Sequence, residues 1–364
     1  MKWEPDLMLQ IGMDGPNVNT KFERDLSTQI FNNYGVSFLK LGSCGLHVTH
    51  NAFGFDETFV SDTSYFFKLS PARRQDYKLM ELFTAIEAKY ALKHTSTRWL
   101  SMKNPVLRIL EQWENINEYF LKYLPKQDNF NSQIKSSSRY KKIVSFLKNP
   151  TSKAELCFIA FVAHDFEDYL SKMQTSEPMI HCMYQRISSF IFNLMKKFIT
   201  HAAITETVDG TSKAKQGSEL VSVDLSKHKR KLETIDIGTR AKEILSEFSI
   251  NSESKEAILE KCMAFYTAST KYLISKLPVS NQFLKDAQYL HPDKRNYVSS
   301  LNAISRLALA VATSLKNHLQ SVFSVSENTT VSEVVDLINN QWQIYQLSDI
   351  PKEWHTIESD NAKK

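Results

Sequence analysis

The fold is decided by a stretch that runs from residue 104 to residue 125 and reads NPVLRILEQWENINEYFLKYLP. Its large apolar residues recur at intervals of three and four, the spacing that places them on one face of an α-helix. They are Val106, Ile109, Leu110, Trp113, Ile116, Phe120 and Leu124. Asn104 followed by Pro105 is typical of a helix start, and Pro125 is expected to end the helix. The stretch therefore predicts a buried helix.

The same helical character extends over most of the chain, because glycine is scarce beyond its first part. The 364 residues contain nine glycines, six of them before residue 55, and none lies between residues 55 and 209. Strand-rich folds need glycine in their turns. Further helices are predicted after Ser70-Pro71 and over residues 152–170, 179–199, 257–277, 301–322 and 331–345. Capping boxes are expected at Ser152 with Glu155 and at Thr330 with Glu333.

The first 54 residues follow a different pattern, that of a βαβ unit. Apolar residues alternate over 7–13, before the turn sequence Asp14-Gly15-Pro16-Asn17. A helix is predicted to start at residue 17 or 19 and to end before Gly35, and a second strand is predicted over 36–41. Two parallel strands are not stable alone. We therefore expect further strands, supplied from upstream or by another chain.

Composition and charge exclude several classes of protein. Lys+Arg exceed Asp+Glu by 45 to 40, so the net charge is +5, which is compatible with an anionic partner without requiring one. Phosphate-binding loops, dinucleotide fingerprints and serine-nucleophile elbows are absent from the sequence. The four cysteines are far apart, which argues against a disulfide framework; they are Cys44, Cys157, Cys182 and Cys262. No signal peptide is recognised, and the apolar stretch 303–322 contains three basic residues, so we expect a reduced, intracellular protein without a membrane partner.

Two groups of residues near the amino terminus are candidates for metal chemistry. Asp14 follows a predicted strand, where a carboxylate can hold Mg²⁺ against a phosphate, although the same residues also form an ordinary β-turn. Cys44, His47 and His50 are spaced by three, which on a helix would place them on one broad face. Zinc is not expected there, because a structural site needs four ligands and only Cys182 beside His181 offers a further candidate. A hydrogen-bonded cluster without metal is the favoured interpretation.

Basic residues gather early in the helical region and favour a polyanionic partner. Residues 61–150 hold 16 Lys+Arg against eight Asp+Glu, including the pair Arg73-Arg74. Arg98 beside Trp99, with Lys103 nearby, suits phosphate contact and stacking on an unpaired base, but a core tryptophan would produce the same pattern. Residues 227–231, Lys-His-Lys-Arg-Lys, resemble a nuclear import signal.

Several of these segments occur together, in order, in one family. Residues 13–19 (MDGPNVN), 42–47 (GSCGLH) and 97–99 (TRW) resemble the hAT superfamily of DNA transposases, in particular the hAT-like transposon proteins of animal genomes. Residues 70–77 (SPARRQDY) and 290–292 (LHP) add to the likeness, which runs over most of the chain. The resemblance implies an RNase H-like catalytic fold interrupted by a large helical insertion, and a metal-dependent polynucleotidyl transferase activity.

The resemblance also implies roles for individual residues. Asp14 would be the second of three catalytic carboxylates and a Mg²⁺ ligand; Cys44 and His47 would match the family's C-x-x-H element. Arg98 and Trp99 would match its R-W element, which approaches distorted DNA. The first catalytic aspartate and the catalytic glutamate find no counterpart in this sequence. One carboxylate cannot position two metal ions, so the chain alone is not expected to cut DNA.

The sequence therefore predicts a mainly α protein in which a partial RNase H-like βαβ unit is followed by a helical insertion domain. The expected divisions are 1–55 for the partial catalytic core, 56–350 for the insertion, with 205–236 as a polar excursion or linker, and 351–364 for a tail. The predicted function is that of a transposase-derived nuclear DNA-binding protein without cleavage activity, its DNA contacts made by Arg73, Arg74, Arg98, Trp99 and Lys103. An intact relative would use Mg²⁺ and could form a homo-oligomer. The alternatives are a nuclear helical scaffold for protein interactions, and part of a longer, active transposase.

Overall fold

The computed structural model describes residues 8–10, 17–39, 41, 45–53, 57–68, 70–93, 102–127, 130, 132–175 and 178–351. Over these residues the chain is mainly helical, as predicted, and the sheet that they contain is a two-stranded hairpin. The α-helices are α1 (Asn17–Tyr34), α2 (Gly45–Ala52), α3 (Thr58–Lys68), α4 (Pro71–Lys78), α5 (Glu81–Thr84), α6 (Lys103–Glu111), α7 (Trp113–Asn117), α8 (Ser132–Ser136), α9 (Ser138–Lys148), α10 (Ser152–Met173), α11 (Ile180–Phe198), α12 (His201–Ile204), α13 (Ser218–Val221), α14 (Thr239–Ser246), α15 (Ser252–Lys276), α16 (Gln282–Ala287), α17 (Ser300–Ser314), α18 (Leu319–Phe323) and α19 (Val331–Leu347). The strands are β1 (Thr205–Val208) and β2 (Thr211–Ala214). The segment η2 (Glu118–Tyr123) is a π-helical turn. The 3₁₀ turns are η3 (Leu124–Lys126), η4 (Leu232–Thr234), η5 (Gln288–Leu290), η6 (Pro292–Lys294) and η7 (Lys316–His318).

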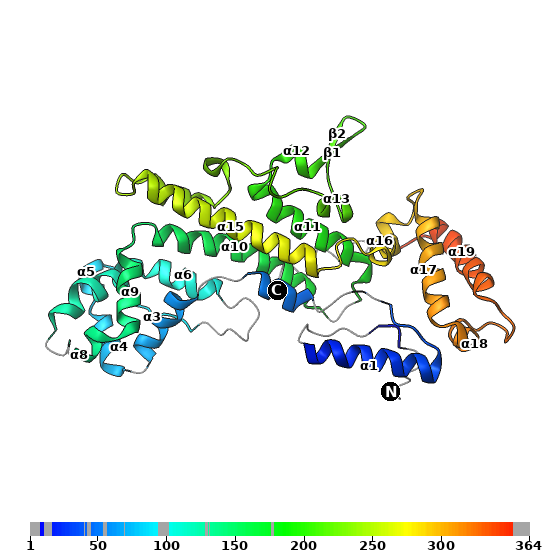
Figure 1. The fold of residues 1–364 in the computed structure, drawn as a ribbon, viewed down its shortest axis with the longest axis horizontal. Helices are drawn as coiled ribbons and strands as arrows, with labels where there is room; N and C mark the ends of the chain where they lie inside the picture. Colours follow the sequence, from blue (N-terminus) through cyan, green and yellow to red (C-terminus); the bar gives the residue numbers. More distant parts are fainter. Residues whose placement is uncertain are drawn as a thin grey trace.

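The helices form an elongated molecule whose two ends are built from different parts of the chain (Figure 1). Helices α3, α4, α5, α8 and α9 gather at one end, and α17, α18 and α19 form the other. The long helices α10, α11 and α15 run between them. One large hydrophobic cluster extends from Val48 to Leu284 and includes the fully buried rings of Phe120, Phe166 and Phe198. The helices at the far end pack around smaller clusters, of which Trp342 is the largest member.

The fold-determining stretch is helical and buried, but it is not one continuous α-helix. The side chains of Val106, Ile109 and Phe120 are fully buried, as the spacing predicts. The helix begins at Lys103 rather than at Pro105, which lies in the first turn, where a missing N–H costs nothing. It is interrupted at Gln112, between α6 and α7. Gln112 is 1% exposed and its amide binds the backbone of a neighbouring segment, a contact that no helical pattern encodes.

Of the predicted helix starts at Ser70, Ser152 and Thr330, the first and the last are confirmed in detail. The Ser70 side chain accepts a hydrogen bond from the Arg73 N–H, and Thr330 with Glu333 forms the complete capping box of α19. The predicted box at Ser152 is wrong, because Thr151 occupies the N-cap position and makes no side-chain cap. The side chain of Asn149 explains the difference. Its Oδ1 accepts hydrogen bonds from both Thr151 N and Thr151 Oγ1, and this turn places Thr151, not Ser152, at the N-cap of α10.

The amino-terminal unit agrees with the prediction in its helix and differs in its strands. α1 ends before Gly35, whose φ of +69° is the left-handed conformation expected after a helix. No strand is formed by the described residues 8–10 and 35–39; the backbone pairing found there is one hydrogen bond, from Leu39 N to Leu9 O (2.8 Å). A single bond does not make a ladder, so the RNase H-like unit is not confirmed. Residues 11–16 lie outside the described part of the chain.

The polar segment 205–236 contains the hairpin and contributes to the main core. β1 and β2 pair antiparallel through the turn Asp209-Gly210, and no residue of either strand is buried. After the hairpin, Leu220, Leu225 and Ile235 are buried in the large cluster. Among the described helices, none is both long and apolar enough to span a bilayer, and the apolar stretch 303–322 is divided between α17 and α18.

Candidate nucleic-acid interface

The residues predicted to contact DNA fall partly within the described structure. Arg73 and Arg74 lie on α4, and Lys103 is the first residue of α6. Arg98 and Trp99 lie outside the described residues, as do Asp14, on which the expectation of Mg²⁺ depends, and Cys44. The described residues of the Cys44, His47 and His50 cluster are His47 and His50, which lie on α2 at the expected three-residue spacing. Over the residues that the structure describes, no three His, Cys, Asp or Glu side chains are placed to share a metal ion.

Arg73 and Arg74 are adjacent but do different things. The Arg73 guanidinium donates to the Phe66 carbonyl (3.2 Å) and lies 4.2 Å from the centre of the Phe66 ring, so it ties α4 to the end of α3. Arg74 is exposed, and none of the described carboxylates forms an ion pair with it. Arg74 is therefore the member of the pair that is available to an external anion.

Lys103 is held inside the protein. Its Nζ lies 3.0 Å from Glu167 Oε2 and 3.4 Å from His164 Nδ1, both on α10. The side chain is only 25% exposed, so a phosphate would have to compete with the Glu167 carboxylate. Lys103 is thus better placed to join α6 to α10 than to bind DNA.

A cluster that the sequence analysis did not identify lies on α3 and α9. Tyr65 is 43% exposed, and the guanidinium of Arg139 and the ammonium of Lys68 lie 4.9 Å and 5.8 Å from the centre of its ring. Arg139 Nε donates to Asp62 Oδ1 (3.0 Å), which fixes the guanidinium beside the ring. The signal available in the sequence was the spacing of Asp62, Tyr65 and Lys68 by three along a helix. The contribution of Arg139, 77 residues from Asp62, could not be read from it.

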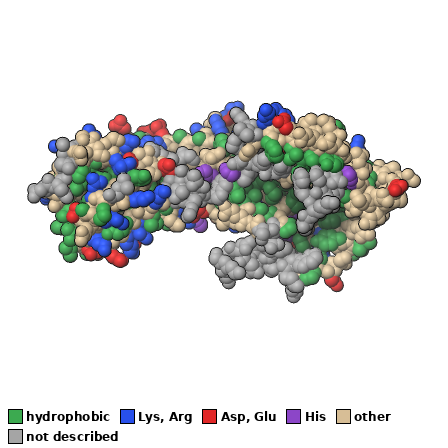
Figure 2. All heavy atoms as spheres, turned by 90° about the horizontal axis from the view of Figure 1, so that it is seen from below, with side chains coloured by type: hydrophobic (Ala, Val, Ile, Leu, Met, Phe, Trp, Pro, Cys, Tyr) green, Lys and Arg blue, Asp and Glu red, His purple; other side chains and the backbone are tan. Residues whose placement is uncertain are grey.

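Basic residues dominate the four helices around this cluster, which we call the basic end (α3, α4, α8 and α9). These helices carry nine Lys and Arg against two Asp. The cations are Lys68, Arg73, Arg74, Lys78, Lys135, Arg139, Lys141, Lys142 and Lys148. All except Arg73 and Arg139 are exposed, and in the described structure no carboxylate pairs with any of these seven. Figure 2 shows Lys and Arg side chains spread over this end of the molecule.

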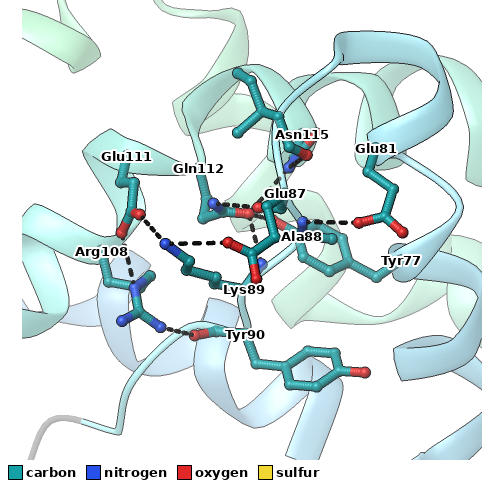
Figure 3. Close-up of polar contacts among 11 residues, drawn as sticks. Tyr77, Glu81, Glu87, Ala88, Lys89, Tyr90, Arg108, Glu111, Gln112 and Asn115 are labelled. Atoms are coloured by element: carbon teal, nitrogen blue, oxygen red, sulfur yellow. Dashed lines mark hydrogen bonds and ion pairs between the residues drawn. The ribbon is translucent and has the colours of Figure 1, made fainter.

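Two neighbouring cations, Lys89 and Arg108, are, in contrast, paired with carboxylates of the protein (Figure 3). Lys89 Nζ lies 2.7 Å from Glu111 Oε1 and 3.5 Å from Glu87 Oε2, and Arg108 Nε lies 3.0 Å from Glu111 Oε2. The hydrogen bond to Glu111 raises the pKa of Lys89, and the same bond lowers the pKa of Glu111. Arg108 also donates to the Tyr90 carbonyl (3.4 Å). These pairs hold the extended segment 86–90 against α6, so their charge is already neutralised.

Three of the four cysteines lie within the described residues, and none of the three forms a disulfide. Cys157, Cys182 and Cys262 are buried free thiols. Burial raises the pKa of Cys157 and of Cys262, which keeps both thiols protonated and unreactive at neutral pH.

Comparison with known proteins does not place the chain in a family. No model of a protein family, no curated protein and no solved structure matches it. The interface is therefore argued from its own residues.

Proposed function

We propose that the chain binds DNA through the basic end. The observation that carries this proposal is the set of seven exposed cations on α3, α4, α8 and α9 without a carboxylate partner. Like charges at this density repel one another, and a bound polyanion relieves that repulsion while releasing its own counterions. Lys89, Arg108 and Lys103 differ from these seven cations, because each of the three is paired with a nearby carboxylate.

The resemblance to hAT transposases is consistent with this function and extends it. Under the proposal, Arg98 and Trp99 would add DNA contacts of their own, as the resemblance implies; both lie outside the described residues. Asp14 would contribute one Mg²⁺-binding carboxylate in an intact relative, in which the chain could also form a homo-oligomer. A single carboxylate does not support two-metal cleavage, so we propose binding without strand cleavage for this chain.

Binding to a DNA duplex as a function of salt concentration tests the proposal. We expect the logarithm of the affinity to fall linearly with the logarithm of salt, with a slope of about −0.9 for each phosphate contacted. The double substitution Arg74→Ala with Lys142→Ala should weaken binding and reduce the slope by about 1 to 2. Lys172→Ala is the matched control, because Lys172 is exposed but paired with Asp168 on α10. Binding that does not depend on salt, or an equal loss of affinity in Lys172→Ala, would show that the basic end is not the DNA-binding surface.

The nuclear location belongs to the same proposal. Residues 227–231 run beside the end of α11, with Thr200 N bound to His228 O and Arg230 N bound to Phe198 O (2.9 and 2.8 Å). Lys227, Lys229 and Lys231 are exposed, so their side chains are accessible to an import receptor. Replacing Lys229 and Lys231 by alanine should move a fluorescent fusion of the protein from the nucleus to the cytoplasm; an unchanged distribution would remove this segment from the proposal.

A protein-interaction scaffold is the second candidate, and one observation favours it. Leu79, which follows α4, and Leu82 and Phe83 on α5 are 43%, 79% and 62% exposed, which is unusual for three neighbouring apolar side chains. If the wild-type chain does not bind DNA and Leu82→Ser with Phe83→Ser abolishes its association with a protein partner, the scaffold function replaces the DNA-binding one.

A further inference from the structure

We propose that Tyr65, Lys68 and Arg139 form a site for an unpaired nucleotide, so that the basic end binds single-stranded DNA in preference to a duplex. This inference rests on the proposed DNA-binding function and specifies its substrate. It assigns the base to the Tyr65 ring and the adjoining phosphate to Lys68.

Tyr65 faces away from the core although its neighbours in sequence are part of it. Phe66 and Phe67 are each 3% exposed and belong to the large hydrophobic cluster, whereas Tyr65 is 43% exposed and belongs to none of the clusters of the described structure. An aromatic ring that is not needed for packing is free to bind a ligand. Its neighbours are charged: Lys68 on the same helix and Arg139 from α9.

The two cations beside the ring have different freedom. Arg139 is fixed, because Asp62 holds its guanidinium and partly neutralises its charge. It therefore positions the ring and makes a cation–π contact with it. Lys68 is exposed and has no carboxylate partner in the described structure, so its flexible stem can turn its ammonium toward a phosphate and uncover the ring.

An unpaired base fits this arrangement better than a duplex does. The face of an exposed aromatic ring can stack on the face of an unpaired base. In a duplex the faces of the bases are already stacked on one another, so the ring cannot reach them. Every base has such a face, so we expect the site to be tolerant of sequence. The exposed cations of the same end, such as Lys135 and Lys142, would follow the backbone on either side of the stacked nucleotide.

The test compares three oligonucleotides of equal length, about 12 nucleotides, by fluorescence anisotropy at one salt concentration. They are a single strand, the same strand with abasic residues, and the corresponding duplex. The wild-type chain should bind the single strand at least about fivefold more tightly than the abasic strand. Tyr65→Ala should weaken binding to the single strand by about 5- to 100-fold and leave binding to the abasic strand unchanged. Tyr65→Phe should behave as the wild type, because stacking needs the ring and not the hydroxyl.

Tyr297→Ala is the matched control, since Tyr297 is 56% exposed and lies before α17, at the other end of the molecule. It should change none of the three affinities. Equal wild-type affinity for the single strand and for either the abasic strand or the duplex, or an unchanged affinity of Tyr65→Ala for the single strand, would overturn this inference alone. Absence of binding to all three oligonucleotides would overturn the proposed function as well.

Discussion

At the scale of single residues, the buried amide of Gln112 connects α4, the extended segment 86–90 and α7. Its Oε1 accepts from Tyr77 OH, Lys89 N and Asn115 Nδ2 at 2.9 to 3.1 Å, and its Nε2 donates to the Glu87 carbonyl (3.0 Å). The amide therefore pairs with the backbone of the extended segment as a neighbouring strand would (Figure 3). Removing it takes the acceptor from the buried Tyr77 hydroxyl and the partner from the half-buried Lys89 N–H and from the Glu87 carbonyl.

Gln112→Ala should lower the free energy of unfolding by about 2 to 4 kcal/mol, because the unsatisfied groups lose their hydrogen bonds and cannot reach water. Urea denaturation measures the change. Gln75→Ala is the control: Gln75 is exposed on α4, and its replacement should change stability by less than about 0.5 kcal/mol. Equal effects of the two substitutions would show that the network of Gln112 does not hold the segment.

At the scale of elements, α1 buries fewer of its described side chains than the other long helices do. Ile30 is its one buried side chain among residues 19–34, and it packs on Val36 and on Leu315, which follows α17. Phe22 and Phe31 are each 54% exposed, although the sequence places them on the apolar side of the helix. Isolated helices are marginally stable in water, so the stability of α1 depends on this small contact.

Hydrogen exchange should therefore be much faster in α1 than in α10 or α15, whose buried faces belong to the main core. Leu315→Ala should speed exchange in α1 further and leave α10 unchanged. Leu309→Ala, an exposed position on α17, should leave both unchanged. Protection of α1 equal to that of α10 would mean that α1 is held by more than the Ile30 contact.

The elements also show what the sequence could and could not predict. Helices α11, α15 and α19 were predicted because their apolar spacing is a local property. The strands predicted over 7–13 and 36–41 need pairing partners, which a local pattern does not supply. The hairpin was missed although Asp209-Gly210 between strand-forming residues is its usual signal. The ring of Tyr65 was missed because Arg139 reaches it from a helix distant in sequence.

At the scale of the whole molecule, buried tyrosines link stability to alkaline pH. Tyr77, Tyr119, Tyr169 and Tyr266 lie in the main core, and burial raises the pKa of each phenol far above its ordinary value of 10.0. Above that value the unfolded chain loses these protons while the folded chain keeps them. The unfolded state is then favoured, so stability is fully present below about pH 10 and is lost as the pH rises further.

The unfolding midpoint should consequently fall steeply above about pH 10. Phenolate absorbance gives an independent reading of when the buried tyrosines ionise. Tyr77, Tyr119, Tyr169 and Tyr266 should ionise only together with unfolding, observed by circular dichroism. A gradual titration of all the tyrosines before any loss of helix would contradict their burial.

The β1–β2 hairpin makes the molecule convenient to label. It projects from the middle of the molecule, away from α3, α4 and α8 (Figure 1). Glu206 and Lys213 are cross-strand partners, and the φ angles of Asp209 and Gly210 are +51° and +73° at the tip. Because no strand residue is buried, a peptide tag inserted between Asp209 and Gly210 would add length without displacing a core side chain. A fluorophore carried there would report on binding at the basic end without occupying it.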